Sequence, residues 1–477
     1  MLFSQPGPIK EDVSISKKWS RRDFLKTSAL FSTGALLAAC APASQPRSQP
    51  KQSVGATDAP KVAVPSDGTK KIVFSTYVWS NFEAAMTEIL NGWKEKTPNG
   101  DFKAQFVPQS IDYWAKVQTQ VARGTPPDCG MADYGRLVSY AKNGTLLDIT
   151  NYIASTKFPI DKSFPGASAQ YRWATGDFDS GATGGNYYAI PSNAQTQIFV
   201  YNKKMFDDAG LAYPSDDWTW NDMLTAAQAM TKPDQNKWGM AAIPNYILLK
   251  GNFVWAAGGA IHTPDFTKSM LADQKTIEAY KWNWDLIYTH KVAPPPGGIT
   301  AQQQNPFMSG QVGMYVEGVW WLTDFATIKD FGWDVAMMPK HPTTGKRTVT
   351  IESDGWWVYK GGKNPDTAWQ LLSYLGTPEG QRRFIPANDC VPSTYLEVAT
   401  DWYAMKPPDS KSKVLQNINE DSAKVDFTYF EFGPITNAVW PVIDKAFADG
   451  SDVTKALQDA DQIMNDELTK AWALLKS

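Results

Sequence analysis

The sequence predicts an α/β protein made of two lobes that share crossing strands. Three observations support this prediction. The chain has 477 residues, more than one domain usually contains. Strand-like and helix-like segments alternate where the folded part begins. Between residues 70 and 477, no segment has the composition of a disordered linker, so two lobes joined by a single flexible connection are not expected.

The alternation is clearest at the start of the folded part. Residues 71–77 (KIVFSTY) are rich in β-forming side chains, and apolar residues recur at helical spacing over 81–96. The Thr97-Pro98-Asn99-Gly100 turn ends that helix. The elements predicted next are a strand over Phe102–Val107, a helix over 112–123 and a short strand over Cys129–Ala132. This order favours a largely parallel sheet.

Helical patterns dominate the later part of the chain. They cover much of 203–290 and 366–385, and an amphipathic helix over Val453–Leu475 is predicted to close the chain. Residues 294–298 (PPPGG) form a loop.

Composition excludes several functions. The formal charge of −3 gives no general attraction to nucleic acid, which we do not expect as a partner. His262, His290 and His341 are isolated in sequence and lack a metal-binding spacing, so neither a metal nor a cofactor is predicted. The 20 tryptophans exceed what a core prefers, because a buried indole N–H needs a partner, and we expect some of them to contact a ligand.

The N-terminus carries two export signals in order. Residues 20–26 (SRRDFLK) resemble a twin-arginine signal, and the apolar stretch Thr27–Ala39 is too short to span a membrane. Residues 37–40 (LAAC) resemble a lipobox, which implies that Cys40 is lipidated. We therefore predict a signal peptide over 1–39 and a lipidated, flexible tether over 40–69. Cys129 and Cys390 could form a disulfide after export or remain two free thiols.

Beyond residue 70 the chain resembles the sugar-binding branch (family 1) of the extracellular solute-binding proteins of ABC importers. Each matching segment is short, and the signal lies in their order and spacing. The segments are DYWAKVQTQ at 112–120 with GTPPD at 124–128, YAIP at 188–191, FVYNKKMF at 199–206, TWND within 218–223, WAAGG at 255–259, FMSGQVGMYVEGVW at 307–320 and SDGWWV at 353–358. Thr219 is expected to cap the helix that begins in the TWND segment.

The resemblance implies a periplasmic-binding-protein-like fold of type II, in which a multi-strand hinge joins two lobes and each lobe is a sheet flanked by helices. It places 70–191 and 322–385 in lobe one, and 192–321 and 386–477 in lobe two. It further implies a monomer that binds a carbohydrate between its lobes and delivers it to the membrane permease subunits of an ABC importer. Such a protein has no catalytic residues. With the lipid anchor, its expected location is the outer face of the bacterial cytoplasmic membrane.

A carbohydrate site needs aromatic faces for sugar C–H groups, and acids and amides for hydroxyl groups. The positions that match the family's ligand-contacting motifs offer both kinds of side chain. Trp320 is the expected stacking platform, with Glu317 just before it. The other candidates are Asn193, Gln195, Asp133, Tyr134, Trp79, Ser80, Asn81, Asp354, Gly355, Trp356, Asn252, Trp255 and Glu431. Trp357 should point away from Trp356 into a core, because side chains alternate along a strand.

Two other functions use similar residues. An exported glycosidase or polysaccharide lyase would also carry tryptophans and carboxylates, and Glu317, Glu352, Asp354 and Glu431 could converge as catalytic acids. The same fold could instead bind a non-sugar ligand such as a polyamine, which acids and aromatic walls would also suit. A structural cell-wall protein would leave the hinge and cleft motifs without a purpose.

Overall fold

The structure is a computed structural model, and the parts of the chain that it describes begin at residue 70. They are residues 70–78, 82–108, 113–173, 185–243, 249–295, 306–384, 392–405, 407–419, 423–425 and 433–476. All of them belong to one compact unit. The predicted signal peptide and tether lie outside the described residues.

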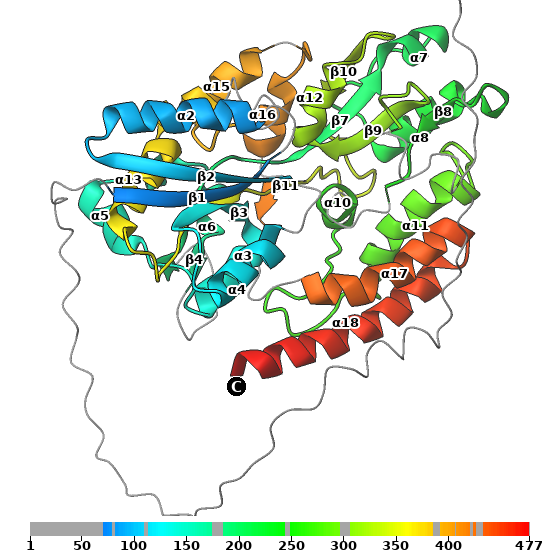
Figure 1. Cartoon of the computed structure of the whole chain (residues 1–477). Helices are drawn as coiled ribbons and strands as arrows, with labels where there is room; N and C mark the ends of the chain where they lie inside the picture. Colours follow the sequence, from blue (N-terminus) through cyan, green and yellow to red (C-terminus); the bar gives the residue numbers. More distant parts are fainter. Residues whose placement is uncertain are drawn as a thin grey trace, which may run out of the picture. The chain divides into compact units, whose positions relative to one another are not determined.

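The first sheet has five strands (Figure 1). In spatial order they are β2 (Gly100–Pro108), β1 (Lys70–Val78), β3 (Cys129–Asp133), β12 (Asp354–Val358) and β6 (Ala189–Pro191). The first three strands are parallel to one another, whereas β12 runs antiparallel to both of its neighbours. The predicted parallel arrangement therefore holds for β1, β2 and β3 only.

Helices cover both faces of the first sheet. On one face pack α2 (Phe82–Lys96), α5 (Thr150–Thr156) and α13 (Pro365–Gly376), and α14 (Pro378–Phe384) follows α13. On the other face pack α3 (Tyr113–Ala122) and α4 (Tyr134–Lys142). Figure 1 shows α2 on one side of β1 and β2, and α3 and α4 on the other. The short elements of this part are η1 (Ile160–Lys162), α6 (Pro165–Ala169), β4 (Arg172–Trp173) and β5 (Asn186–Tyr187).

The second sheet has four strands and is mainly antiparallel. In order they are β10 (Trp333–Ala336), β7 (Gln197–Asn202), β9 (Val312–Gly318) and β8 (Trp238–Met240), and only β8 and β9 are parallel. Alternate residues of β7 enter two different cores, with Phe199 in one and Ile198 and Val200 in the other. This alternation follows from the two-residue period of a strand.

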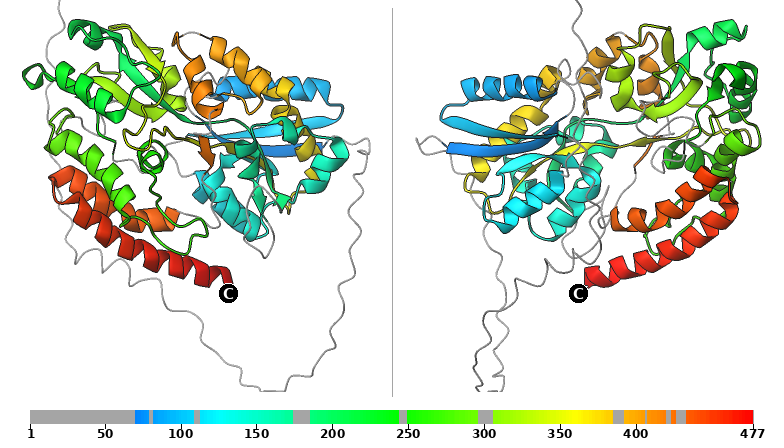
Figure 2. Two further views of the ribbon diagram at one scale, coloured as in Figure 1. Left: turned by 180° about the vertical axis from the view of Figure 1, so that it is seen from behind. Right: turned by 45° about the vertical axis from the view of Figure 1, so that its right-hand side comes forward.

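One face of the second sheet carries most of the helices. They are α7 (Lys203–Asp208), α8 (Trp220–Met230), α10 (Trp255–Ala257), α11 (Gln274–Tyr288), α17 (Gly433–Asp449) and α18 (Val453–Lys476). Helices α11, α17 and α18 lie side by side in both views of Figure 2. The opposite core includes α12 (Leu322–Phe325), α15 (Leu396–Ala404) and α16 (Ser412–Asn419). The remaining short elements are η2 (Pro233–Gln235), η3 (Lys250–Val254), η4 (Val319–Trp321), β11 (Val349–Ile351) and β13 (Ala423–Val425).

Local signals in the sequence are confirmed where they set helix ends. The Thr219 side chain accepts from the backbone N–H of Asp222, whose carboxylate accepts from the N–H of Thr219. This capping box begins α8 at the predicted position. Asn202 likewise caps α7, through its side-chain oxygen and the N–H of Met205.

One predicted lobe boundary is wrong. We placed residues 322–385 in lobe one, but β10 pairs with β7 of the second sheet, and Leu322 and Phe325 pack in a core of that sheet. The chain returns to the first sheet only between β11 and β12, near residues 351–354. The apolar patterns of 322–348 are compatible with either lobe, and only the strand pairing decides between them.

Three segments cross between the sheets and hydrogen-bond to one another. Residues 192–196 run antiparallel to 352–354, with paired backbone bonds between Gln195 and Glu352 at 2.7 and 2.9 Å. The third segment begins at Pro392, whose carbonyl oxygen accepts from the N–H of Ala194 at 3.0 Å. The predicted boundary at 191–192 falls between β6 of the first sheet and the crossing segment 192–196. In the described part of the chain, no helix is long and apolar enough to cross a membrane.

Candidate functional site

A buried carboxylate organises the candidate site on the first sheet. Asp354 begins β12, and its carboxylate accepts three hydrogen bonds from neutral donors. Tyr77 Oη donates to Oδ1 at 2.6 Å, while Asn193 Nδ2 and Gln195 Nε2 donate to Oδ2 at 3.0 and 2.7 Å. These contacts join the end of β1, the start of β12 and the first crossing segment at one point. We refer to Tyr77, Asp133, Asn193, Gln195 and Asp354 as the Asp354 cluster.

Asp133 adds a second carboxylate to this cluster. It ends β3 and is the register partner of Asp354 in the antiparallel ladder. Side chains of directly opposed residues lie on the same face of a sheet. Burial raises the pKa of Asp354, and the charge of Asp133 raises it further, whereas the three hydrogen bonds lower it. The pKa of Tyr77 lies well above its usual value because of burial and the same two carboxylates.

Asn193 and Gln195, both predicted to meet ligand hydroxyls, differ in exposure. Asn193 is 1% exposed, and its amide oxygen also accepts from the backbone N–H of Asp354 at 3.0 Å. It therefore links the first crossing segment to β12, and its predicted contact with a ligand stays a prediction. Gln195 is half-buried and can still offer its second amide N–H to a ligand.

The aromatic part of the candidate site lies at the end of β9. Trp320 belongs to the single turn η4 and is half-buried. Its indole covers Gly318 so closely that a Cβ on this residue would lie 2.0 Å from Trp320 Cζ2. Glycine at 318 therefore allows the ring to fold over the backbone, leaving the indole partly accessible.

Glu317 is the acid next to this ring. It is 7% exposed, and its carboxylate accepts from the backbone N–H of Gly318 at 2.9 Å. Burial raises the pKa of Glu317 to about 7, although the bond from Gly318 and one from Tyr315 lower it in part. Near neutral pH, Glu317 can therefore present either a carboxylate or a carboxylic acid.

This burial predicts a pH dependence of stability. The pKa of Glu317 rises from about 4.5 to about 7 on folding, so the folded state binds more protons between these values. The free energy of unfolding should fall as pH rises from 4.5 to 7, by on the order of 3 kcal/mol in all. Urea titrations at several pH values should show that Glu317→Gln reduces this slope, while Glu95→Gln at an exposed position keeps it. Equal slopes in all three proteins would contradict the assignment.

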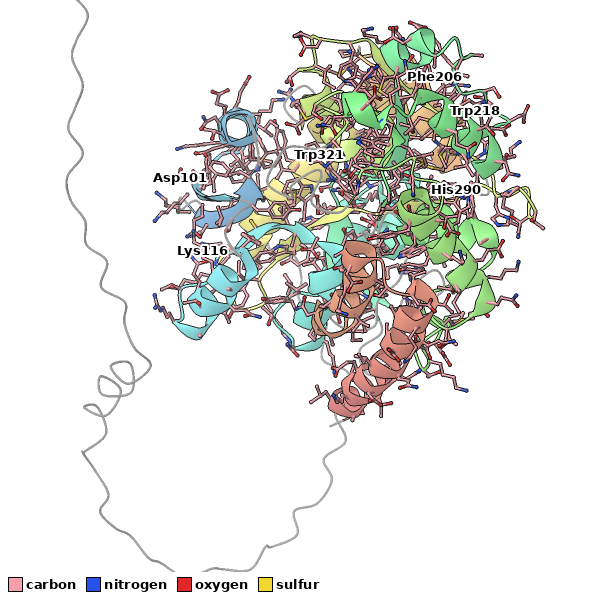
Figure 3. The ribbon with its side chains drawn as sticks, turned by 90° about the vertical axis from the view of Figure 1, so that its right-hand side faces the viewer. Asp101, Lys116, Phe206, Trp218, His290 and Trp321 are labelled. Carbon is pink, nitrogen blue, oxygen red and sulfur yellow. The ribbon has the colours of Figure 1, made fainter. Side chains whose placement is uncertain are left out.

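The Asp354 cluster and the Trp320 turn are connected through the first crossing segment. Gln195 bonds to Asp354, and one residue later the carbonyl of Thr196 accepts from the N–H of Val319 at 2.9 Å. In Figure 3 the neighbouring Trp321 lies between the blue and cyan elements of the first sheet and the green elements of the second. The first crossing segment thus contacts both groups of candidate residues.

Two candidates on β12 pack against neighbouring aromatic rings. Trp356 is 1% exposed and packs on Phe74, with ring centroids 5.9 Å apart, in the core beneath α2 and α13. A Cβ on Gly355 would lie 2.7 Å from the ring of Tyr171. Both residues therefore serve packing, and their predicted contacts with a ligand stay predictions. Trp357 enters the opposite core, which confirms the prediction that it points away from Trp356.

Asn252 lies on the turn before α10, and Trp255 is the first residue of α10. Asn252 is buried within η3, a single π-helical turn, and Trp255 is half-buried. Gly251, beside Asn252, packs against a link between two crossing segments, where the side-chain oxygen of Gln197 accepts from the N–H of Thr350 at 2.7 Å. The carbonyl of Gly251 accepts from Thr348 Oγ1 at 2.6 Å. This turn is thereby tied to the crossing segments.

The side chains of the remaining predicted residues lie outside the described part of the structure. Tyr134 begins α4 directly after Asp133, and its side chain is not described. Trp79, Ser80, Asn81, Glu431 and Cys40 lie outside the described residues. Cys390 does as well, whereas Cys129 is a free thiol buried in β3.

Sequence reasoning missed Tyr77 and Gln197. Tyr77 lies near the carboxyl end of a parallel strand, the edge at which α/β sheets usually carry their ligand sites. From this rule we predicted only residues that directly follow a strand as site residues. The same rule could have identified Tyr77 as well. Gln197 carries no comparable signal, because its partner Thr350 is 153 residues away. Among the residues described, no three acids, histidines or cysteines gather as a metal site would require.

Known proteins share this two-lobed architecture. An ABC substrate-binding protein of Listeria monocytogenes, solved in complex with cycloalternan, superposes with a TM-score of 0.74 at 24% identity, covering 84% of this chain and 99% of that one. The fold is thus that of a two-domain solute-binding protein.

Sequence comparison identifies the family. Residues 79–382 match the family described as bacterial extracellular solute-binding protein, and the chain belongs to it. A maltotriose-binding protein of Pyrococcus abyssi is 24% identical over 65% of this chain and 63% of its own length. A diacetylchitobiose-binding protein of Streptomyces coelicolor is 25% identical over 61% of this chain and 68% of its own.

Proposed function

We propose that this protein captures a carbohydrate and delivers it to the membrane permease of an ABC importer. The observation that carries the proposal is the pairing of a half-buried indole, Trp320, with the acids and amides of the Asp354 cluster across one crossing segment. The family and the saccharides named for two relatives support it.

The two halves of the site match the two surfaces of a sugar. The accessible part of Trp320 offers an apolar face for C–H groups. Asp133 and Gln195 are half-buried and offer a carboxylate and an amide to hydroxyl groups. Hydrogen bonds to a charged acceptor are stronger than bonds between neutral groups, which favours a hydroxyl-rich ligand.

The crossing segments supply the connection that such a protein needs. A ligand shifts a balance between open and closed lobes only through contacts that differ between the two states. Side chains from both sheets lie beside residues 193–197, so a ligand bound there would contact both lobes when they close. The permease would then bind the closed form of a monomer.

The N-terminal motifs extend the proposal to location. The twin-arginine-like residues 20–26 and the lipobox ending at Cys40 support export followed by lipidation. The protein would then be held at the outer face of the cytoplasmic membrane by its lipid and the tether of residues 41–69.

An enzymatic role is less well supported. A glycosidase needs two carboxyl groups available to one glycosidic bond. Asp354 is 4% exposed and already accepts three hydrogen bonds, so it is not available for proton transfer. The relatives named above are binding proteins. We therefore propose that the bound sugar is not altered.

A thermal-shift panel tests the proposal. The purified protein is heated with maltotriose, diacetylchitobiose, mannobiose and an arabinooligosaccharide, and with spermidine as a non-sugar. When a ligand binds the native state but not the unfolded state, a free ligand concentration a hundredfold above its Kd stabilises the native state by about 2.7 kcal/mol. We expect at least one saccharide to raise the melting temperature and to be recovered intact. Hydrolysis of the saccharide would favour a glycosidase, and a shift with spermidine alone would favour a polyamine-binding protein.

A further inference from the structure

We infer that Gln197 and Thr350 are positioning residues of the carbohydrate site. They form a buried link between β7 and β11 that holds the turn leading to Trp255, one of the predicted ligand contacts. This inference rests on the proposed function, because it concerns how the same site is kept in shape. Gln197 and Thr350 are both 0% exposed, so they act on a ligand only through the residues that they position.

The link consists of two hydrogen bonds that run in opposite directions. The side-chain oxygen of Gln197 accepts from the backbone N–H of Thr350 at 2.7 Å, and Nε2 of Gln197 donates to the hydroxyl oxygen of Thr350. Leaving either end of a buried amide unpaired costs free energy, so these bonds favour one arrangement of the two strands. A single side chain thereby fixes the start of β7 to the middle of β11.

The turn η3 packs directly on this link. A Cβ on Gly251 would lie 2.7 Å from Thr350 Cγ2 and 3.1 Å from Gln197 Oε1, which leaves no room for a side chain. The carbonyl oxygen of Gly251 accepts from Thr348 Oγ1 at 2.6 Å, so the turn is also bonded to the residue before β11. A π-helical turn is rare, and such turns are often found at functional sites. The position of η3, and hence of Trp255 directly after it, depends on the link.

Gln197 is also connected to the turn that carries Trp320. It is the register partner of Gly318 across β7 and β9, and side chains at opposed positions lie on the same face of a sheet. The Trp320 ring covers the place that a Cβ on Gly318 would take, so the ring lies on the face toward which Gln197 points. One buried amide therefore connects the two turns that carry Trp320 and Trp255.

This connection matters for a ligand that contacts both rings. An apolar pair in place of Gln197 and Thr350 would fill the core without desolvating polar groups, but it would not specify how the two turns are placed. Binding sites lose affinity when their supporting residues allow displacements of about 1 Å. Loss of the link should therefore weaken saccharide binding in a protein that still folds.

Calorimetric titration of threonine variants tests the inference, with the four saccharides of the thermal-shift panel as probes. Thr350→Val keeps the shape of the side chain but leaves Nε2 of Gln197 without its acceptor. Well below its melting temperature, this variant should bind about tenfold more weakly than the wild type. Thr350→Ser retains the hydroxyl group and should bind nearly as tightly as the wild type. Thr367→Val, the same change at a buried position of α13 in the first lobe, should leave affinity unchanged.

A double-mutant cycle separates positioning from a merely structural role. Trp255→Ala should itself weaken binding, and adding Thr350→Val to it should weaken binding little further, because both changes act through the same ring. A structural role would lower the melting temperature of Thr350→Val and leave its Kd unchanged. Wild-type affinity in Thr350→Val or in Trp255→Ala, or additive losses in the double variant, overturns the inference and leaves carbohydrate binding intact. Failure of every panel saccharide to bind the wild-type protein counts against the proposed function itself, and against this inference with it.

Discussion

Replacing Trp320 with Ala should weaken saccharide binding by about thirtyfold or more and remove the shift in melting temperature at moderate ligand concentrations. The indole is the half-buried aromatic face at the end of β9, and removing such an anchor from a binding site typically costs 2 kcal/mol or more. Calorimetric titration of the saccharide identified by the thermal-shift panel measures the change.

The adjacent tryptophan provides a matched control. Trp321 belongs to the same turn, but its ring stacks on Phe325, with centroids 6.0 Å apart and an interplanar angle of 23°. Trp321→Ala should lower the melting temperature and leave affinity nearly unchanged. Gly318→Ala should weaken binding without removing the indole, because the new methyl group would collide with Trp320 and displace the ring. If Trp321→Ala weakens binding as strongly as Trp320→Ala, the ring at 320 is not the platform.

Replacing Asp354 with Ala should destabilise the ligand-free protein by about 3–5 kcal/mol, the usual cost of removing one partner from a buried charged network. The change leaves the hydroxyl of Tyr77 and the amides of Asn193 and Gln195 without their acceptor. Asn193 is almost fully buried, so water cannot replace the lost bond easily. Urea unfolding followed by circular dichroism measures the loss.

Two milder variants should lose less stability than Asp354→Ala. Asp354→Asn keeps an acceptor oxygen and removes the repulsion from Asp133, so its loss should be clearly smaller than that of the Ala variant. Tyr77→Phe removes a single donor and should cost about 1 kcal/mol. An Asp354→Ala protein as stable as the wild type would show that the cluster does not hold the crossing segments to the first sheet.

The accuracy of the sequence-based predictions depended on the distance over which each signal acts. The first strands and helices and the cap at Thr219 follow from neighbouring residues, and the structure reproduces them. The boundary at residue 322 was wrong because β10 and β7 are more than 130 residues apart in sequence, and no local pattern specifies their pairing.

The candidate site shows the same division. The motif around Trp320 and Glu317 indicated an aromatic ring beside an acid, and the structure places both at the end of β9. The alternation of β12 showed that Trp356 and Trp357 point in opposite directions, but it could not tell which core each would enter. Packing against Phe74 decided that Trp356 is a core residue.

By itself, then, the sequence determined the α/β class, the positions of the early strands and helices, and the residue types from which a sugar site can be built, because local periodicity and capping encode them. Only the tertiary structure decided that Asn193, Gln195 and Tyr77 converge on Asp354, and that Asp133 faces the same carboxylate. The three donors lie 159 to 277 residues from Asp354 in the sequence, and Asp133 faces Asp354 only because β3 pairs with β12, so no local pattern specifies these contacts.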